Sequence, residues 1–298
     1  MELWVIATIA AAAVQTIRFM LQKRLKGLGL STGGATFSRF LFAVPLACAG
    51  VAVLMATRGY ALPPLGPVFW GFAAAGGVAQ IIATFCTVAL FSERSFAVGI
   101  AFTKTETVQV ALFSAVFLAE AVSGMGIVAI LIGLAGVLLL SRPPEGWVAG
   151  KIFNRATVLG LMAGALFGAS AIGYRGATLE VANADPLFRA LLTLACVTAF
   201  QTFVMVLWLR WREAGELTRV LAAWRAVLPV GVTGVLGSLG WFTAFALQNA
   251  AYVRSVGQVE LIFSILVSML VFGEKPKPRE VVGMGLLALS IILIVALA

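Results

Sequence analysis

Seven charged residues lie within stretches of the sequence that are otherwise apolar, and their chemistry is the first feature to explain. They are Arg18, Arg39, Lys104, Glu106, Arg175, Arg189 and Glu260. A charge near the centre of a membrane helix opposes insertion by about 2.5–3.5 kcal/mol, so each of these groups needs a partner. If all are ionised, five cations face two carboxylates. Because an unpaired buried cation is costly, the surplus predicts a wet cavity or an anionic ligand.

Arginine is suited to binding such a ligand, because its planar guanidinium can hold a carboxylate or phosphate through two hydrogen bonds. We expect Arg18 and Arg175 to face a central cavity and to bind the acidic part of a zwitterionic or anionic solute. Arg39 and Arg189 are further candidates for substrate binding or gating. The structural alternative is that these arginines cap helix ends, extend to the membrane interface or pair with the glutamates to hold the fold together.

Lys104 and Glu106 are two residues apart, so on a helix they point about 200° apart and cannot pair well with each other. Both therefore need partners on other helices. The later stretch Gln258-Val259-Glu260 keeps the acid and has an amide in place of the lysine. Lys104 and Gln258 are candidates for substrate binding. Each glutamate can act as a proton-coupling group if the bundle desolvates it, as a permanently ionised partner of an arginine, or as a substrate contact.

Aromatic residues near these charges can form the wall of an organic ligand site. Tyr174 precedes Arg175 and Trp241 lies within a later apolar stretch, so both are candidate ligand contacts. The alternative is that they fill the helix bundle. The chain has no histidine, and its three cysteines form no CxxC pair. We therefore expect no metal, no cofactor and no histidine-based catalytic triad.

The elements that carry these residues are predicted to be membrane helices. The 298 residues are 61% hydrophobic and only 11% charged, which excludes a soluble globular enzyme. At about 20 residues per crossing, long apolar runs separated by short polar links predict an all-α bundle of ten transmembrane helices in a lipid bilayer. The expected helices are 3–21, 32–57, 68–91, 96–118, 123–140, 156–178, 186–209, 226–247, 252–272 and 281–297.

The basic residues between these helices are distributed unevenly, and their distribution predicts the orientation of the chain. Loops after the odd-numbered helices hold Lys23, Arg24, Lys26, Arg94, Arg142, Lys151, Arg155, Arg210, Arg212, Arg219, Arg225, Lys275, Lys277 and Arg279. The opposite loops hold only Arg58 and, at a helix start, Arg254. Basic residues in short loops stay in the cytoplasm, so we expect both termini outside a bacterial-type inner membrane. The net charge of +9 is therefore an orientation signal and does not predict nucleic-acid binding.

The intramembrane charges recur between residues 1–148 and 149–298. Arg18 corresponds to Arg175, Arg39 to Arg189, and Glu106 to Glu260. Glu106 and Glu120 are 14 residues apart, as are Glu260 and Glu274. With five helices per half, an odd number, the two halves must be inverted relative to each other. Such inverted repeats are typical of secondary transporters and bring charges of both halves toward a common centre.

Several motifs within this plan are similar to those of a known family. They are Ser38-Arg39-Phe40-Leu41-Phe42-Ala43, Phe188-Arg189-Ala190-Leu191, Phe117-Leu118-Ala119-Glu120 before Gly126, Gly133 and Gly136, and Phe272-Gly273-Glu274 before Gly283. The chain resembles the drug/metabolite transporter superfamily, specifically its ten-helix EamA-type members. The resemblance extends over essentially the whole chain and implies two five-helix repeats and transport of a small metabolite.

The sequence therefore predicts a secondary active transporter that moves a small organic metabolite, such as an amino acid or its derivative, by alternating access, with export as the expected direction. Protons are the candidate coupling ion, and the protein is expected to be a monomer or a homodimer. A membrane-embedded enzyme is an alternative, although its acid and base candidates would be limited to Glu106, Glu260 and Lys104. A channel or scaffold subunit is the other alternative, but scattered, repeated charges fit a closed binding site better than a continuous pore.

Overall fold

A computed structural model describes residues 2–90, 102–140, 155–263, 265–266 and 278–297. Within these residues the regular structure is entirely helical. Seven of the described segments are long and apolar enough to cross a membrane, and α6 and α7 are shorter apolar helices. The chain is thus a multi-pass, all-α membrane protein, as the composition predicts.

The described part of residues 1–148 contains six helices. They are α1 (Leu3–Gly27), α2 (Thr32–Leu41), α3 (Ala43–Arg58), α4 (Pro67–Leu90), α6 (Glu106–Phe117) and α7 (Gly124–Leu140). The remaining residues form α9 (Arg155–Leu179), α10 (Pro186–Arg212), α11 (Glu216–Ala222), α12 (Trp224–Leu247), α13 (Ala250–Val256), the 3₁₀ helix η1 (Gly257–Val259) and α15 (Pro278–Leu297).

The second predicted helix, 32–57, is divided in the structure. α2 ends at Leu41, Phe42 is a turn residue, and α3 begins at Ala43. The cause is Pro45, which has no backbone N–H to donate and whose ring would collide with the carbonyl group of Leu41 in a continuous helix. The two helices together still form one apolar segment long enough to cross a membrane.

The short helix α11 is absent from the sequence-based prediction, and it packs against the start of α2. Glu216 of α11 is fully buried, accepts a hydrogen bond of 2.6 Å from the backbone N–H of Ser31 and pairs with Arg219 at 2.5 Å. A carboxylate is favourable at a helix N-terminus, where backbone N–H groups lack partners within the helix. α11 thus fixes the start of α2, the helix that carries Arg39.

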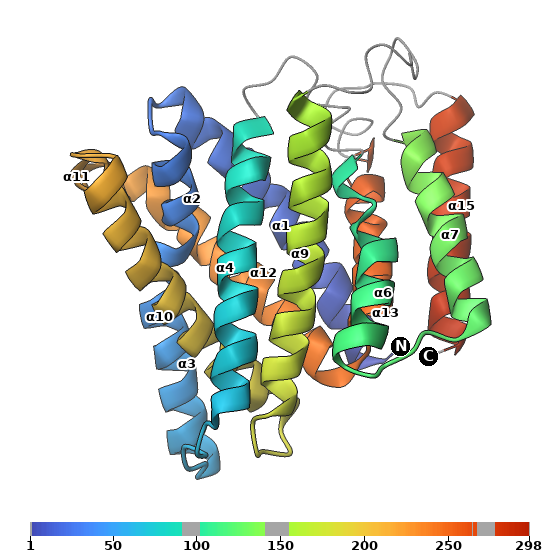
Figure 1. The fold of residues 1–298 in the computed structure, drawn as a ribbon, viewed down its shortest axis with the longest axis horizontal. Helices are drawn as coiled ribbons and strands as arrows, with labels where there is room; N and C mark the ends of the chain where they lie inside the picture. Colours follow the sequence, from blue (N-terminus) through green and yellow to red (C-terminus); the bar gives the residue numbers. More distant parts are fainter. Residues whose placement is uncertain (1, 91–101, 141–154, 264, 267–277, 298) are drawn as a thin grey trace.

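Helices from the two parts of the chain pack against each other in three long pairs. α4 lies along α9, α1 along α12, and α7 along α15 (Figure 1). The first pair is held very close, because a Cβ atom added at Gly173 of α9 would lie 2.7 Å from the Cα atom of Gly76 in α4. The third pair is equally close, since a Cβ atom at Gly136 would lie 2.8 Å from the carbonyl oxygen of Gly283. Glycine faces of this kind allow membrane helices to approach closely.

Figure 1 also shows that α1 begins and α15 ends at the same end of the bundle, which is the arrangement that an even number of crossings produces. α3 ends at this same end, and α2 begins at the opposite one. The three long helix pairs each join one helix from residues 1–148 to one from residues 149–298, so the described parts of the two predicted halves are interleaved in space.

Candidate functional site

A small cavity lies where α1, α2, α4, α9, α12 and α13 meet. Its lining is polar and aromatic, and consists of Gln15, Arg39, Gln80, Phe167, Ser170, Ala171, Tyr174, Ser238, Trp241, Phe242, Phe245 and Arg254. Its volume is about 20 Å³, which is room for roughly one water molecule. The residues of a central site are therefore assembled, while the space for an organic molecule is closed in this conformation.

Arg39 of α2 extends into this cavity with weak hydrogen bonding. Its side chain is only 4% exposed. One Nη atom lies 3.3 Å from the hydroxyl of Thr84 in α4, and the other lies 3.5 Å from the hydroxyl of Ser238 in α12. Both distances are longer than the usual 2.9–3.0 Å or so of an N–H···O bond. Among the described residues, no acid pairs with Arg39.

Arg18 of α1 is a second buried cation without an acidic partner in the described part of the chain. It donates one hydrogen bond of 2.7 Å to Gln22, while its other Nη atom has no hydrogen-bond partner there. Gly234 of α12 lies beside both arginines, since a Cβ atom added to it would lie 3.4 Å from Cγ of Arg39 and 3.8 Å from Cδ of Arg18. Arg18 and Arg39 therefore approach the same point of α12.

Two ion pairs next to the cavity join residues that are far apart in the sequence. Lys104, in the turn before α6, pairs with Glu260, which also accepts a hydrogen bond of 3.0 Å from Gln15. Arg254 of α13 pairs with Glu106 of α6 at 2.6 Å. Each predicted carboxylate thus has a cation from the other predicted half of the chain.

Gln15, Gln258 and Trp241 connect these two ion pairs. The side-chain amide nitrogen of Gln258 donates a hydrogen bond of 3.4 Å to Oε1 of Glu106. The indole N–H of Trp241 donates to Gln15 at 3.1 Å, and the guanidinium of Arg254 lies 4.8 Å from the centre of the Trp241 ring. The network therefore runs from Lys104 to Gln258 through both glutamates, and its members Gln15 and Arg254 line the cavity beside Trp241.

The structure gives Arg175 a different set of partners from the predicted solute contact. Its guanidinium forms a two-bonded pair with Glu120 at 2.5 and 2.6 Å. Its remaining Nη atom donates to the backbone carbonyls of Phe245 and Gln248, at 2.6 and 2.7 Å. Because these bonds use the whole fork, Arg175 binds α12 to the segment that follows α6, and it does not line the cavity.

Arg189 of α10 also binds helix ends. It donates to the carbonyl oxygen of Thr178 at 2.9 Å and to that of Ala246 at 3.4 Å. These carbonyls belong to the last turns of α9 and α12, where the helix dipole favours a cation. The half-buried Arg189 therefore has the helix-capping position that the sequence leaves open as an alternative.

The two aromatic candidates, Tyr174 and Trp241, both line the cavity. The ring of Tyr174 stacks on Phe242 with centres 4.4 Å apart, and its hydroxyl accepts a hydrogen bond of 3.2 Å from Gln201. Trp241 stacks on Phe245 at 6.1 Å. These near-parallel rings form one wall of the site and occupy part of the space between the helices.

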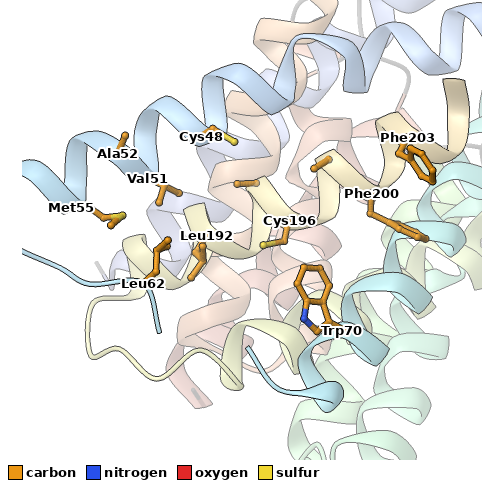
Figure 2. A pocket seen from close by; sticks show the side chains of 12 residues that line it. Cys48, Val51, Ala52, Met55, Leu62, Trp70, Leu192, Cys196, Phe200 and Phe203 are labelled. Atoms are coloured by element: carbon orange, nitrogen blue, oxygen red, sulfur yellow. The ribbon is translucent and has the colours of Figure 1, made fainter. Parts of the chain in front are cut away.

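A larger groove lies on the outside of the bundle and contains none of the candidate residues. Figure 2 shows it between α3, which contributes Cys48, Val51, Ala52 and Met55, and α10, which contributes Leu192, Cys196, Phe200 and Phe203, with Trp70 of α4 at its side. Its volume is about 680 Å³, and no charged side chain lines it. A lining of this kind fits the hydrocarbon of the bilayer better than a charged solute.

Sequence reasoning missed two of the charged partners. Arg254 is assigned to a helix start in the opposite set of loops, but the structure buries it against Glu106. Glu120 is noticed only as part of a motif, and the structure pairs it with Arg175. The signal for both is present in the sequence, because the predicted surplus of buried cations and the two unpaired glutamates require partners of these types.

Comparison with known proteins finds a family domain in the chain. Residues 154–296 match the model of the EamA-like transporter family. The chain carries an EamA-like transporter domain. This family belongs to the drug/metabolite transporter superfamily, which confirms the resemblance, and its members are transporters and not enzymes. The match covers the second of the two predicted halves of the chain.

The fold of the chain is also found in a protein of known crystal structure. The two share 17% sequence identity with a TM-score of 0.66, over 97% of this chain and 99% of the other. At this identity the likeness shows the fold alone. No curated protein is a significant match to the chain.

Proposed function

We propose that this protein is a secondary transporter that binds a small zwitterionic or anionic organic solute in the central cavity. The observation that carries the proposal is Arg39, a buried cation that lines the cavity without an acidic partner among the described residues. An uncompensated buried charge is strongly destabilising, so an anionic group of the solute supplies the missing partner. The EamA-like domain supports transport as the activity.

The proposed architecture is two inverted repeats, 1–148 and 149–298. In this repeat α1 corresponds to α9, and α4 corresponds to α12. The packing of α4 along α9 and of α1 along α12 supports the proposal, because a twofold axis would exchange one pair for the other. The ion pairs of Glu106 with Arg254 and of Glu260 with Lys104 also cross between the halves.

Alternating access would open the two ends of the cavity in turn. Glu106 is the first residue of α6, and Glu120 lies three residues after its end. At 1.5 Å per residue, the two ends of α6 are roughly 18 Å apart. The pairs of Glu106 and Glu260 would therefore close one end of the pathway, and the Arg175–Glu120 pair would close the other. When the ion pairs at one end separate while those at the other end stay closed, Arg39 is exposed to one side of the membrane.

We propose the proton as the coupling ion, carried by Glu106 or Glu260. Both carboxylates lie beside the cavity, and each is paired with a cation. Protonation of a carboxylate would release its cation and weaken the ion pairs that close one end of the pathway. Glu106→Gln and Glu260→Gln mimic the protonated state. We expect the variant of the glutamate that carries the proton to lose solute accumulation driven by a pH gradient and to keep solute exchange. Full gradient-driven accumulation in both variants rejects carboxylate coupling.

The proposed location is the inner membrane, with the basic loops in the cytoplasm and both termini outside. The concentration of lysine and arginine in one set of loops supports this orientation. We propose export as the direction of transport, which rests on the family resemblance. Flux measured in inside-out and right-side-out vesicles from the same cells tests the direction.

Counterflow in proteoliposomes tests the proposed function. Vesicles are loaded with one solute from a panel of amino acids, organic acids, nucleosides and sugar derivatives, and uptake of the labelled solute is measured. A carrier gives uptake that internal solute stimulates. Arg39→Gln should abolish it, whereas Arg58→Gln should not, because Arg58 is 53% exposed and pairs with Asp185 outside the cavity. Uptake without such stimulation for every solute contradicts a carrier and favours a channel.

A further inference from the structure

Among the described residues, the lining of the cavity includes a cation without an acidic partner and no acid, and this difference determines which solutes fit it. Its two charged lining residues are Arg39 and Arg254. Arg254 is already neutralised by Glu106, whereas the hydrogen bonds of Arg39 to described residues are two long ones, to the hydroxyls of Thr84 and Ser238. Among the described residues, the lining includes no aspartate or glutamate. The site therefore has one unsatisfied charge, and that charge is positive.

The positive character of this site extends beyond Arg39. Arg18, only 2% exposed, approaches the same glycine of α12 and has one Nη atom without a hydrogen-bond partner in the described chain. Charges interact more strongly in a protein interior than in bulk water, because the effective dielectric constant is lower there. A second uncompensated cation near Arg39 strengthens the attraction for an anion and repels an ammonium group.

The two acids closest to the cavity do not offer an ammonium group a place. Glu106 is bound to Arg254 and Glu260 to Lys104, so an ammonium group could reach either carboxylate only by displacing a cation. The face of Trp241 is an alternative cation site in principle. It is already occupied, because the guanidinium of Arg254 lies 4.8 Å from the ring centre.

The apolar part of the lining is mostly aromatic and arranged in planes. Tyr174 and Phe242 are inclined by 28°, and Trp241 and Phe245 by 23°. Phe167 completes this set of five rings. A flat apolar group can stack on such surfaces, and aromatic stacking adds about 0.5–1.5 kcal/mol per pair beyond the area that is buried.

We propose that the site selects an organic monoanion with a planar apolar body and without an amino group. The carboxylate binds Arg39, and the planar body packs against the rings of Phe167 and Phe245. This inference rests on the proposed transport function and narrows its solute class from zwitterions and anions to aromatic monoanions. Rearrangement of the halves provides the space, which is closed in the described conformation.

Four probes of similar size test this selection by isothermal titration calorimetry on the purified protein. They are 3-phenylpropanoate, phenylalanine, 2-phenylethylamine and hexanoate, which differ in the amino group, the charge or the ring. We expect 3-phenylpropanoate to bind at least tenfold more tightly than each of the others. Equal or tighter binding of phenylalanine or the amine overturns the exclusion of ammonium. Equal binding of hexanoate overturns the planar body, and no binding by any probe overturns the whole inference.

Variants of Arg39 locate the bound carboxylate. Arg39→Gln should weaken 3-phenylpropanoate binding at least tenfold, and Arg39→Lys, which keeps the charge but loses the fork, should weaken it to a smaller extent. Arg58→Gln is the matched control and should bind normally. Unchanged binding in Arg39→Lys and Arg39→Gln contradicts the assignment to Arg39. Counterflow of a different solute by the wild-type protein would still support transport, so the two proposals can fail separately.

Discussion

Arg175 donates four hydrogen bonds, more than the described residues give to Arg18, Arg39 or Arg189. It joins Glu120 to two carbonyls at the end of α12. Removal of one partner from a buried ion pair leaves an uncompensated charge, which costs about 3–5 kcal/mol. We therefore expect Arg175→Gln to lower thermal stability strongly, and Arg175→Lys to lower it by less, because a lysine keeps the charge but cannot form the two-bonded pair.

A double-mutant cycle separates the pair from the carbonyl contacts. Glu120→Gln in the Arg175→Gln background should cost little further stability, since the interaction is already lost. Arg58→Gln provides a surface comparison, because an exposed pair contributes about 0–1 kcal/mol. Independent, additive losses for Arg175 and Glu120, measured by denaturant unfolding in detergent, would contradict the proposed interaction.

For Glu106 and Glu260, the sequence predicts the need for a partner but not which residue that partner is. The apolar surroundings of Glu106 and Glu260 were enough to predict that each needs a partner on another helix, and the structure gives each a cation. The identity of those cations depends on which helices meet. Residues 148 positions apart, such as Glu106 and Arg254, are brought together only by the tertiary fold. Whether Arg18 and Arg39 bind solute stays a prediction.

At the scale of helices, the close contact of α4 with α9 depends on glycine. A Cβ atom at Gly173 would lie 2.7 Å from both Cα of Gly76 and the carbonyl oxygen of Phe72, so the clash would be with backbone that cannot rotate away. Gly173→Ala should therefore force the helices apart, at a cost of about 1–3 kcal/mol. Thermal unfolding in detergent measures the effect.

Gly71, near the start of α4, offers a matched control. A Cβ atom there meets nothing within 4 Å. Since alanine is a better helix former than glycine by about 0.8–1.0 kcal/mol, Gly71→Ala should be neutral or slightly stabilising. If both alanine variants behave alike, close backbone packing does not explain the glycine at 173.

The periodic apolar runs predicted the existence of most helices, because about 20 apolar residues in a row have few stable alternatives in a membrane. They did not predict the division after Leu41 or the helix α11. The first depends on a single proline, and the second is a short helix held by the buried Glu216. A search for long hydrophobic segments does not detect a break at one residue or a helix of seven residues.

At the scale of the whole molecule, the orientation of the chain is a direct prediction of its charge distribution. α1 begins and α15 ends at the same end of the bundle, so a single reporter decides the side for both. A phosphatase that is active only outside the cytoplasm, fused after Ala298, should be active. The same fusion after Arg142 should be inactive. Activity in the reverse pattern contradicts the positive-inside assignment.

A charge exchange tests the contact between the two predicted halves. Lys104→Glu alone places two acids together, and Glu260→Lys alone places two cations together, so each should be strongly destabilising. The double variant restores an ion pair in which the acid and the cation have exchanged positions. It should recover a substantial part of the lost stability, with a coupling energy of about 0.5–3 kcal/mol. Stability of purified protein measures it, and no recovery in the double variant would place the two residues out of contact.

The cross-chain ion pairs also have a consequence for biosynthesis. Arg254 follows Glu106 by 148 residues, which corresponds to roughly 7 to 30 s of translation at about 5–20 residues per second. During this interval the first half enters the bilayer with Lys104 and Glu106 lacking the partners that neutralise them. The early helices can therefore complete these ion pairs only after α13 has left the ribosome, close to the end of synthesis.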